Sequence, residues 1–187
     1  KQDWKDRVIL VTAGPTIENL DPARFISNRS SGKMGVILAQ AARLRGGKVH
    51  LIHGPLNVPD AWLEGLSTYQ IKTSSEMQTQ LAKLQSKADA VAMASAVSDI
   101  RSKSNDSSKK LCKADLLASL GKQLEQVPDL LAEISSRRKP GQIILGFSAL
   151  TGLDYQINEL GESKRKEKGC DLLFANPIDR HGQGFEE

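Results

Sequence analysis

The sequence is poor in cysteine, in aromatic residues and in long apolar runs. Its only two cysteines, Cys112 and Cys170, form no CxxC pair, which excludes a disulfide framework and a cysteine-rich zinc site. An aromatic content of 4% leaves few rings to stack on bases and argues against nucleic-acid binding. No apolar run approaches the ~20 residues of a membrane span. We therefore expect a reducing, cytoplasmic setting, with neither a membrane nor a nucleic acid as partner.

Familiar nucleotide and metal motifs are also missing. The sequence has no GxGxxG fingerprint and no Walker A motif. Its three histidines, His50, His53 and His181, are not at metal-ligand spacing. What the chain does have is basic charge, with a net charge of +4 and lysines clustered at 103–113 and 164–168. Such clusters indicate either a solvated surface or an anionic ligand.

Length and composition fit one ordinary globular domain. The 187 residues are 39% hydrophobic and 26% charged, enough for one α/β domain over residues 1–187 with a full core. Because the chain begins without methionine, we expect it to be a fragment of a longer protein or a processed form.

Strand-like and helix-like segments alternate along the chain. The apolar run at 88–96 is typical of a parallel strand buried on both faces. The pattern predicts an α/β fold: one Rossmann-like, doubly wound, mostly parallel sheet with helices on both faces. Ser74 or Ser75 is expected to cap the second helix. We expect strands at 7–13, 48–53, 68–73, 88–96, 142–149 and 172–175, and helices at 33–45, 76–86, 130–138 and 154–169.

Three segments interrupt this pattern. A strand-to-helix connection usually needs about 2–6 residues, yet 14–35 is a loop of ~20 residues, which favours a functional role. Residues 98–108 are expected to form a polar, mobile loop that closes over a bound nucleotide. Residues 109–124 are ambiguous between helix and strand.

The long loop carries groups suited to a phosphate. Glycines let a backbone approach an anion closely, and the amides that begin the following helix attract negative charge. Ser30, Ser31 and Lys33 add donors there. Asn28 offers an amide that could orient a carboxylate, or it could be a turn or cap residue.

Further polar groups follow later strands. Asp99, after the small residues 94–96, could bind hydroxyls or a metal-bound water, or cap a loop. Lys109, Lys110 and Lys113 could neutralise a triphosphate or lie on a solvated loop. Phe147, expected at a strand end, could stack on a base or belong to the core.

Together these segments resemble the phosphopantothenoylcysteine synthetase family. In most bacteria that enzyme is the C-terminal half of a bifunctional protein that begins with a flavin-dependent decarboxylase. The resemblance covers nearly the whole chain, and its most specific part is the loop itself. The matching segments are AGPTIENLDPARFISNRSSGKMG, AVSD at 96–99, VPDLL at 127–131, GFSAL at 146–150, KRKEKGCDLLFAN at 164–176 and GFEE at 184–187.

The resemblance implies a ligase of coenzyme A biosynthesis. The family joins 4′-phosphopantothenate to L-cysteine through an acyl-nucleotide, using CTP in bacterial and ATP in animal members. It releases pyrophosphate and then the nucleoside monophosphate, with Mg²⁺ held mainly by the nucleotide phosphates and no protein metal ligands assigned. The chain resembles the bacterial members of the family, which favours CTP. The family also implies a homodimer, for which the apolar residues of 111–124 suggest an interface.

The resemblance also carries residue roles. Asn28 matches the essential asparagine that acts on the carboxylate and the acyl intermediate. Lys110 matches the lysine that promotes acyl-nucleotide formation, although an ungapped match would select Lys109. Val127 stands where the family tends to have asparagine. The nucleotide-binding matches are Gly14, Ser30, Ser31, Gly32, Met93, Ala94, Ser95, Asp99, Pro128, Phe147, Lys164 and Lys168.

Two other functions remain open on the sequence. An NAD(P)-binding oxidoreductase of Rossmann type would share the fold, but it would be expected to carry GxGxxG and a Tyr-x-x-x-Lys-like pair. A non-catalytic module would bind a nucleotide or phosphate without turnover.

Overall fold

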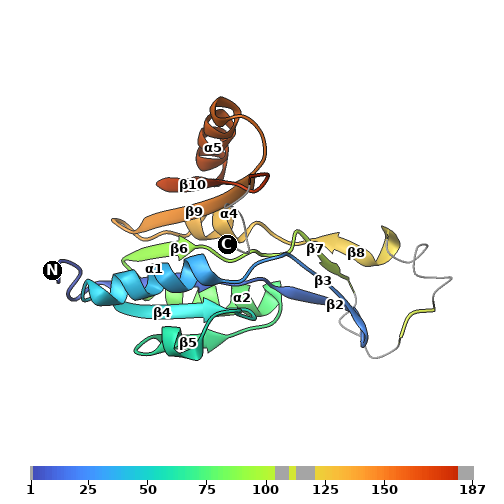
Figure 1. Cartoon of the computed structure of the whole chain (residues 1–187), viewed down its shortest axis with the longest axis horizontal. Helices are drawn as coiled ribbons and strands as arrows, with labels where there is room; N and C mark the ends of the chain where they lie inside the picture. Colours follow the sequence, from blue (N-terminus) through green and yellow to red (C-terminus); the bar gives the residue numbers. More distant parts are fainter. Residues whose placement is uncertain (1, 104–109, 113–120, 181–187) are drawn as a thin grey trace.

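A computed structural model describes residues 2–103, 110–112 and 121–180. At its centre is a six-stranded sheet whose strands are all parallel, in the order β10-β9-β6-β1-β4-β5 (Figure 1). The strands of this sheet are β1 (Val8–Ala13), β4 (Lys48–His53), β5 (Ser67–Gln70), β6 (Ala90–Met93), β9 (Ile143–Leu150) and β10 (Leu172–Pro177).

The strand order makes the sheet doubly wound. The chain moves outward from β1 through β4 to β5, then returns to place β6 on the other side of β1 and continues through β9 to β10. In such sheets, ligands bind beyond the carboxyl ends of the strands, near the point where the winding reverses. The predicted fold class is therefore confirmed, and the reversal lies between β1 and β6.

Helices cover both faces of this sheet. On one face, α1 (Lys33–Leu44) buries Val36, Ala39 and Ala42 against alternate residues of β1 and β4. On the other, α2 (Ser74–Leu84) packs against β4 and α4 (Leu130–Ser136) against β9, within a second hydrophobic core. The helix α5 (Asp154–Lys168) packs against β9, β10 and α4. Because successive side chains of a strand point to opposite faces of the sheet, β1 contributes side chains to two separate hydrophobic cores.

Several element boundaries differ from those expected. Thr73, rather than Ser74 or Ser75, caps α2, because its hydroxyl accepts from the Glu76 amide while Glu76 accepts from the Thr73 amide. This reciprocal pair is a capping box. The strand β6 covers only 90–93, and the apolar residues after it form a loop. Short 3-10 helices, η1 (Asp60–Leu63) and η2 (Gln85–Lys87), lie in connections.

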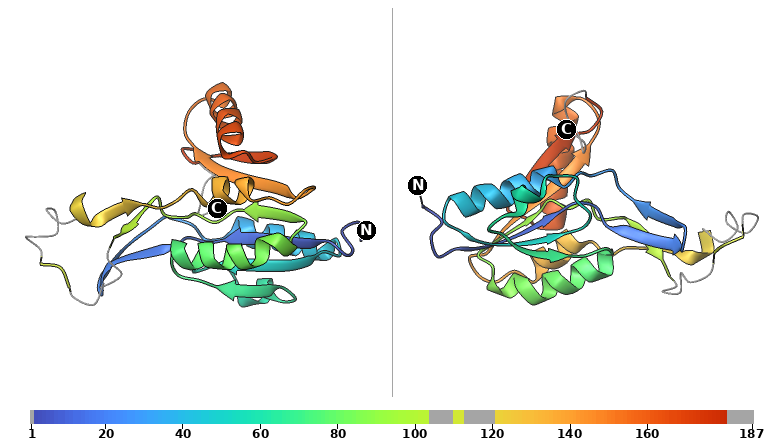
Figure 2. Two further views of the ribbon diagram at one scale, coloured as in Figure 1. Left: turned by 180° about the vertical axis from the view of Figure 1, so that it is seen from behind. Right: turned by 60° about the horizontal axis from the view of Figure 1, so that its bottom comes forward.

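The expected long loop is in part a hairpin. Strands β2 (Ile17–Asp21) and β3 (Arg24–Ser27) pair antiparallel, and the part of 98–108 that the structure describes contributes β7 (Ile100–Ser102), which pairs with β8 (Leu124–Gln126). Figures 1 and 2 show the two hairpins projecting together from the sheet as one arm. The loop prediction was therefore wrong for these strands, and Leu124 is in a strand. The remainder of the expected 98–108 loop and most of 109–124 lie outside the described residues.

Polar contacts attach this arm to the domain. The buried Glu18 carboxylate accepts a 2.7 Å hydrogen bond from the Ser74 amide at the start of α2. Arg101 pairs with Glu125 across the β7–β8 hairpin and donates to the Ser75 hydroxyl. Because the anchoring residues are polar and come from distant parts of the chain, apolar periodicity could not predict the hairpins.

Within the described ranges, no helix has both the length and the apolar character needed to cross a membrane. The cysteines are both free thiols, with Cys170 buried and Cys112 exposed.

Candidate active site

A cavity of about 340 Å³ opens at the carboxyl ends of β6 and β9, beside the reversal of the winding. Its volume is at the lower end of the ~300–1,000 Å³ typical of small-molecule sites. It brings together many of the predicted nucleotide-binding residues from four separate segments, namely Met93, Ser95, Asp99, Pro128, Phe147, Lys164 and Lys168.

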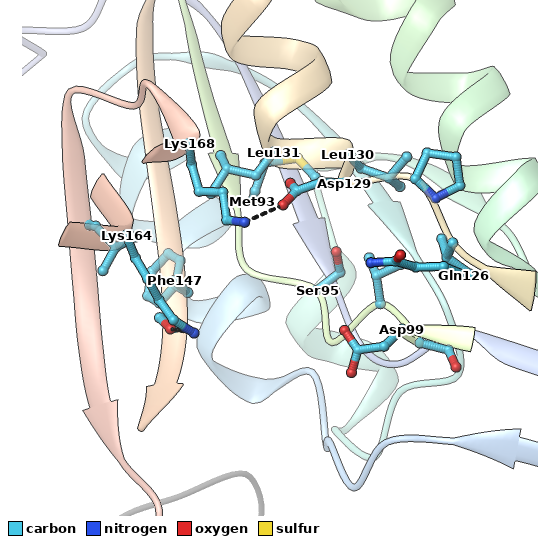
Figure 3. Close-up of a pocket in the computed structure, with 16 residues that line it drawn as sticks. Met93, Ser95, Asp99, Gln126, Asp129, Leu130, Leu131, Phe147, Lys164 and Lys168 are labelled. Carbon is cyan, nitrogen blue, oxygen red and sulfur yellow. Dashed lines mark hydrogen bonds and ion pairs between the residues drawn. The ribbon is translucent and has the colours of Figure 1, made fainter. Parts of the chain in front are cut away.

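Two lysines of α5 supply positive charge on one side of the cavity (Figure 3). Lys164 and Lys168 are one helical turn apart and so lie on the same face of the helix. The Lys164 ammonium donates to the Ser148 hydroxyl at 3.2 Å. The Lys168 ammonium lies 2.6 Å from the Asp129 carboxylate and 2.7 Å from that of Glu167. These hydrogen bonds raise the pKa of Lys168, so its side chain is charged at neutral pH.

Asp129 is both a helix cap and the partner of Lys168. One of its carboxylate oxygens accepts from the Ala132 amide at the start of α4, and the other faces Lys168. Burial by itself would raise the pKa of Asp129, but the Lys168 hydrogen bond and the helix amides together hold it below its usual value. The cavity therefore contains a pre-formed ion pair at the N-terminus of α4.

Asp99 and Gln126 lie across the cavity from these lysines (Figure 3). The backbone places them, because the Asp99 carbonyl accepts from the Val127 amide at 2.9 Å. The hydroxyl of Ser95 is fixed by Thr12 at 2.8 Å, which links the cavity to β1. The described residues contain no cluster of three or more His, Cys, Asp or Glu side chains able to hold a metal ion.

Phe147 lies within β9 rather than at a strand end, which corrects the expected position. Its ring stacks on that of Phe174 in β10, with centroids 5.3 Å apart and planes 19° from parallel. Phe147 thus contributes both to the lining of the cavity and to an aromatic pair between neighbouring strands. Its proposed contact with a base stays a prediction.

Asn28 is not among the residues that line the cavity, but it contacts the backbone of a residue that is. Its side-chain amide donates to the Val97 carbonyl at 2.9 Å, with a longer 3.5 Å contact to the carbonyl of Ala96. Because both partners are acceptors, the NH₂ group must face them, and the side-chain oxygen points elsewhere. Val97 itself lines the cavity, so Asn28 and the cavity share one backbone segment.

The glycine and serine residues of the loop form a tight turn on the same segment. The Gly14 carbonyl accepts a hydrogen bond from the Ala96 amide. Gly14 and Gly32 are close together, because a Cβ added to Gly32 would lie 3.1 Å from the Gly14 nitrogen. Ser30 and Ser31 accept hydrogen bonds from the amides of Gly32 and Lys33 at the start of α1. Each serine hydroxyl thus accepts from the amide two residues further on in the turn that leads into α1, whose N-cap residue is Gly32, and contact of the serines with a phosphate stays a prediction.

Substitution of Gly14 by alanine should destabilise the fold strongly. Gly14 has φ of +74°, and an added Cβ would lie 2.6 Å from the Pro55 carbonyl oxygen. Gly141 has φ of +77° with nothing within 4 Å, so Gly141→Ala isolates the backbone strain. We expect Gly141→Ala to cost about 1–2 kcal/mol and Gly14→Ala more than about 3 kcal/mol in the free energy of unfolding. Chemical denaturation would measure both, and equal losses would contradict the crowding at Gly14.

Lys110 is exposed and is not among the residues that line the cavity, and its neighbour Leu111 contacts Asp21 and Arg24 at the turn between β2 and β3. Ala94 is likewise not in the lining, although its neighbours Met93 and Ser95 are.

The lining also contains residues that the sequence reasoning did not select. In the sequence, Asp129 stands out only as part of the matching segment VPDLL, and Ser148 only as part of GFSAL. Each is close in sequence to a predicted residue, Pro128 or Phe147, and this adjacency is the available signal. The other unselected residues are Val97, Ser98, Gln126, Val127, Leu130, Leu131 and Leu173.

Fold and site together define a doubly wound α/β domain with a lysine-lined cavity at the carboxyl ends of its strands. The chain belongs to the DNA/pantothenate metabolism flavoprotein C-terminal domain family, whose model matches residues 4–187.

Known proteins agree with this membership. The chain is 34% identical to a Coenzyme A biosynthesis bifunctional protein CoaBC from Vibrio vulnificus over 97% of this chain and 44% of the relative. It is 35% identical to a protein of the same name from Borreliella burgdorferi over 97% of this chain and 45% of the relative. The solved C-terminal domain of a CoaBC protein is 28% identical, with a TM-score of 0.75 over 95% of this chain and 79% of that domain. The chain thus spans less than half the length of these curated relatives.

Proposed function

We propose that this domain is a phosphopantothenate–cysteine ligase of coenzyme A biosynthesis that uses CTP. The observation that carries the proposal is the pair of ammonium groups on α5, in a cavity at the carboxyl ends of the strands, in a member of this family. Such a site suits a nucleoside triphosphate, because two ammonium groups on one helix face can offset the hydration that the phosphates lose on entering the cavity.

The proposed reaction has two steps. A carboxylate oxygen of 4′-phosphopantothenate attacks the α-phosphorus of CTP, and pyrophosphate leaves with the electrons of the broken P–O bond. The amine of L-cysteine then attacks the acyl carbon, loses a proton and forms the amide, while CMP leaves. In the first step Lys164, Lys168 and Lys110 would stabilise negative charge on the phosphates. In the second, Asn28 would orient the acyl group.

Mg²⁺ would enter with the nucleotide and add charge neutralisation at the phosphates. The donor set fits this role, because Asp99 is a single exposed carboxylate facing the lysines and could hold a metal-bound water. Asp129 is already engaged by Lys168.

Pyrophosphate release tests the proposal directly. We expect release with CTP and Mg²⁺ that requires 4′-phosphopantothenate, and less release when ATP replaces CTP. Addition of L-cysteine should convert the acyl intermediate to product and CMP. Release that is equal without phosphopantothenate would contradict a ligase.

The two alternative functions give different results in binding experiments. An oxidoreductase should bind NADPH in calorimetry, whereas the ligase should bind CTP. A binding module would bind CTP and release no pyrophosphate. Neither alternative accounts for membership of a family whose relatives are named for coenzyme A biosynthesis.

We further propose that the domain works in the cytoplasm as a homodimer, and that in the longer protein a flavin-dependent decarboxylase is fused to it. The arm leaves Phe25 59% exposed and Ile100 39% exposed, which suits a surface covered by a second copy. Most of the expected interface at 111–124 lies outside the described residues. Light scattering at micromolar concentration should give the mass of two chains, and the mass of one chain would reject the dimer.

A further inference from the structure

The turn between β2 and β3 holds the lysine-bearing segment by its backbone. The Asp21 carboxylate accepts from the Leu111 amide at 3.2 Å, and the Arg24 guanidinium donates to the Leu111 carbonyl at 3.1 Å. Both polar groups of one peptide residue, 87–90 positions away in sequence, are therefore bound by two side chains of one turn. We call Asp21 and Arg24 the turn clamp.

The clamp is built as a rigid unit. The Asp21 side chain is fully buried, and its other oxygen accepts from the Ala23 amide of the same turn at 2.8 Å. Arg24 lies 3.4 Å from Asp21 and is 29% exposed. Burial alone would raise the pKa of Asp21, but the two amides and the Arg24 charge hold it below its usual value. The carboxylate is thus ionised near neutral pH and has all its partners within the protein.

We propose that Asp21, with Arg24, is a positioning residue for Lys110 in the activation step. Lys110 is the residue directly before Leu111. Hydrogen bonds to the N–H and the C=O of Leu111 therefore hold the backbone from which the lysine side chain extends. The clamp makes the lysine segment part of the β2–β3 hairpin, and the lysine moves with that hairpin. This proposal rests on the proposed function.

The proposed activation step explains why the backbone beside Lys110 would need to be held in place. A flexible segment would have to be ordered each time the lysine acts, and a displacement of about 1 Å at a catalytic group can cost about 10²-fold in rate. The described part of the segment, residues 110–112, forms no helix or strand, so side-chain contacts must fix it.

The test uses Asp21→Asn. The amide oxygen can still accept from Ala23, but the NH₂ group then faces the Leu111 N–H, donor against donor. We expect kcat for pyrophosphate release to fall about 10–100-fold, with the KM for CTP within about threefold because the cavity is untouched. Ala23→Ser, at an exposed position of the same turn, is the matched control and should behave as the parent chain.

A double-mutant cycle separates positioning from simple destabilisation. If Asp21 acts through Lys110, Asp21→Asn should cause no further loss in a Lys110→Ala background. A full additional loss in that background, or an unchanged kcat in the single variant, would overturn the proposal. Chemical denaturation of each variant checks that the fold is kept.

Hydrogen exchange gives a readout that needs no turnover. Peptides spanning 110–112 should exchange about tenfold faster or more in Asp21→Asn than in the parent chain. Unchanged exchange would mean that the clamp does not hold the segment in solution. If the parent chain releases no pyrophosphate with any nucleotide, the proposed function fails and the positioning role fails with it, while faster exchange in the variant would still establish the clamp.

Discussion

Replacement of Asn28 by alanine is expected to lower ligation of 4′-phosphopantothenate and L-cysteine by about 10²-fold or more. The side-chain amide is anchored by the Val97 carbonyl at 2.9 Å, which fixes the direction of its oxygen, and Val97 itself lines the cavity. Alanine removes both the anchored donor and the oriented acceptor. Product formation measured under saturating substrates would give the loss directly.

The control for this variant is its neighbour. Ser27→Ala removes a 2.8 Å hydrogen bond to the Thr16 carbonyl at the same strand end and leaves Asn28 in place. We expect Ser27→Ala to keep most of the activity and Asn28→Ala to keep the fold, since Asn28 is only partly buried. Ligation within about threefold of the parent chain in Asn28→Ala would remove the residue from the proposed mechanism.

The second large effect is expected at Lys168. Lys168→Met keeps the aliphatic stem but removes the ammonium, so the cavity loses a cation and the Asp129 carboxylate loses its 2.6 Å partner. An unpaired anion would then face the nucleotide phosphates. We expect the Kd for CTP to rise about 10–100-fold, since each tenfold step corresponds to about 1.4 kcal/mol and hydrogen bonds to charged groups contribute about 1.5–3 kcal/mol. Calorimetry with CTP and Mg²⁺ would measure this.

Lys166 offers a matched control on the same helix. Its side chain is 70% exposed and pairs with Glu162, away from the cavity lining. Lys166→Met removes the same net charge, so any general electrostatic effect of losing one lysine appears in both variants. Equal weakening of CTP binding in the two would show that α5 attracts the nucleotide by overall charge and that Lys168 has no specific contact.

The main fold could be predicted because its signals are local. The apolar run at the start of the chain and the helix-period pattern of 33–45 are each complete within about a dozen residues, and the expected segments match β1 and α1 closely. The two hairpins could not be predicted in this way. Their strands are short, and the hairpins are attached through Glu18, Arg101 and other polar groups whose partners lie far along the chain.

The residues of the candidate site can also be divided into those that the sequence predicts and those that depend on the packing of distant segments. Asp99 is a candidate from its position after the small residues 94–96, Lys164 and Lys168 are candidates through the family resemblance, and all three line the cavity. Asp129 was not selected as a site residue, because its pairing with Lys168 spans 39 positions and exists only when α4 and α5 pack together. Lys110 and Asn28 are candidates both from their own chemistry and through the family resemblance, and neither is among the residues that line the cavity.

The sequence by itself determined a doubly wound α/β domain, the succession of strands and helices in its central sheet and the segments that carry polar groups, because periodicity and turn residues act over short distances. Only the tertiary structure decided which of those groups meet. The anchoring of Asn28 on Val97, the Asp129–Lys168 pair and the grip of Asp21 and Arg24 on Leu111 join residues 39–90 positions apart. Such polar contacts leave no periodic pattern in the chain, since their geometry arises only when separately folded elements pack.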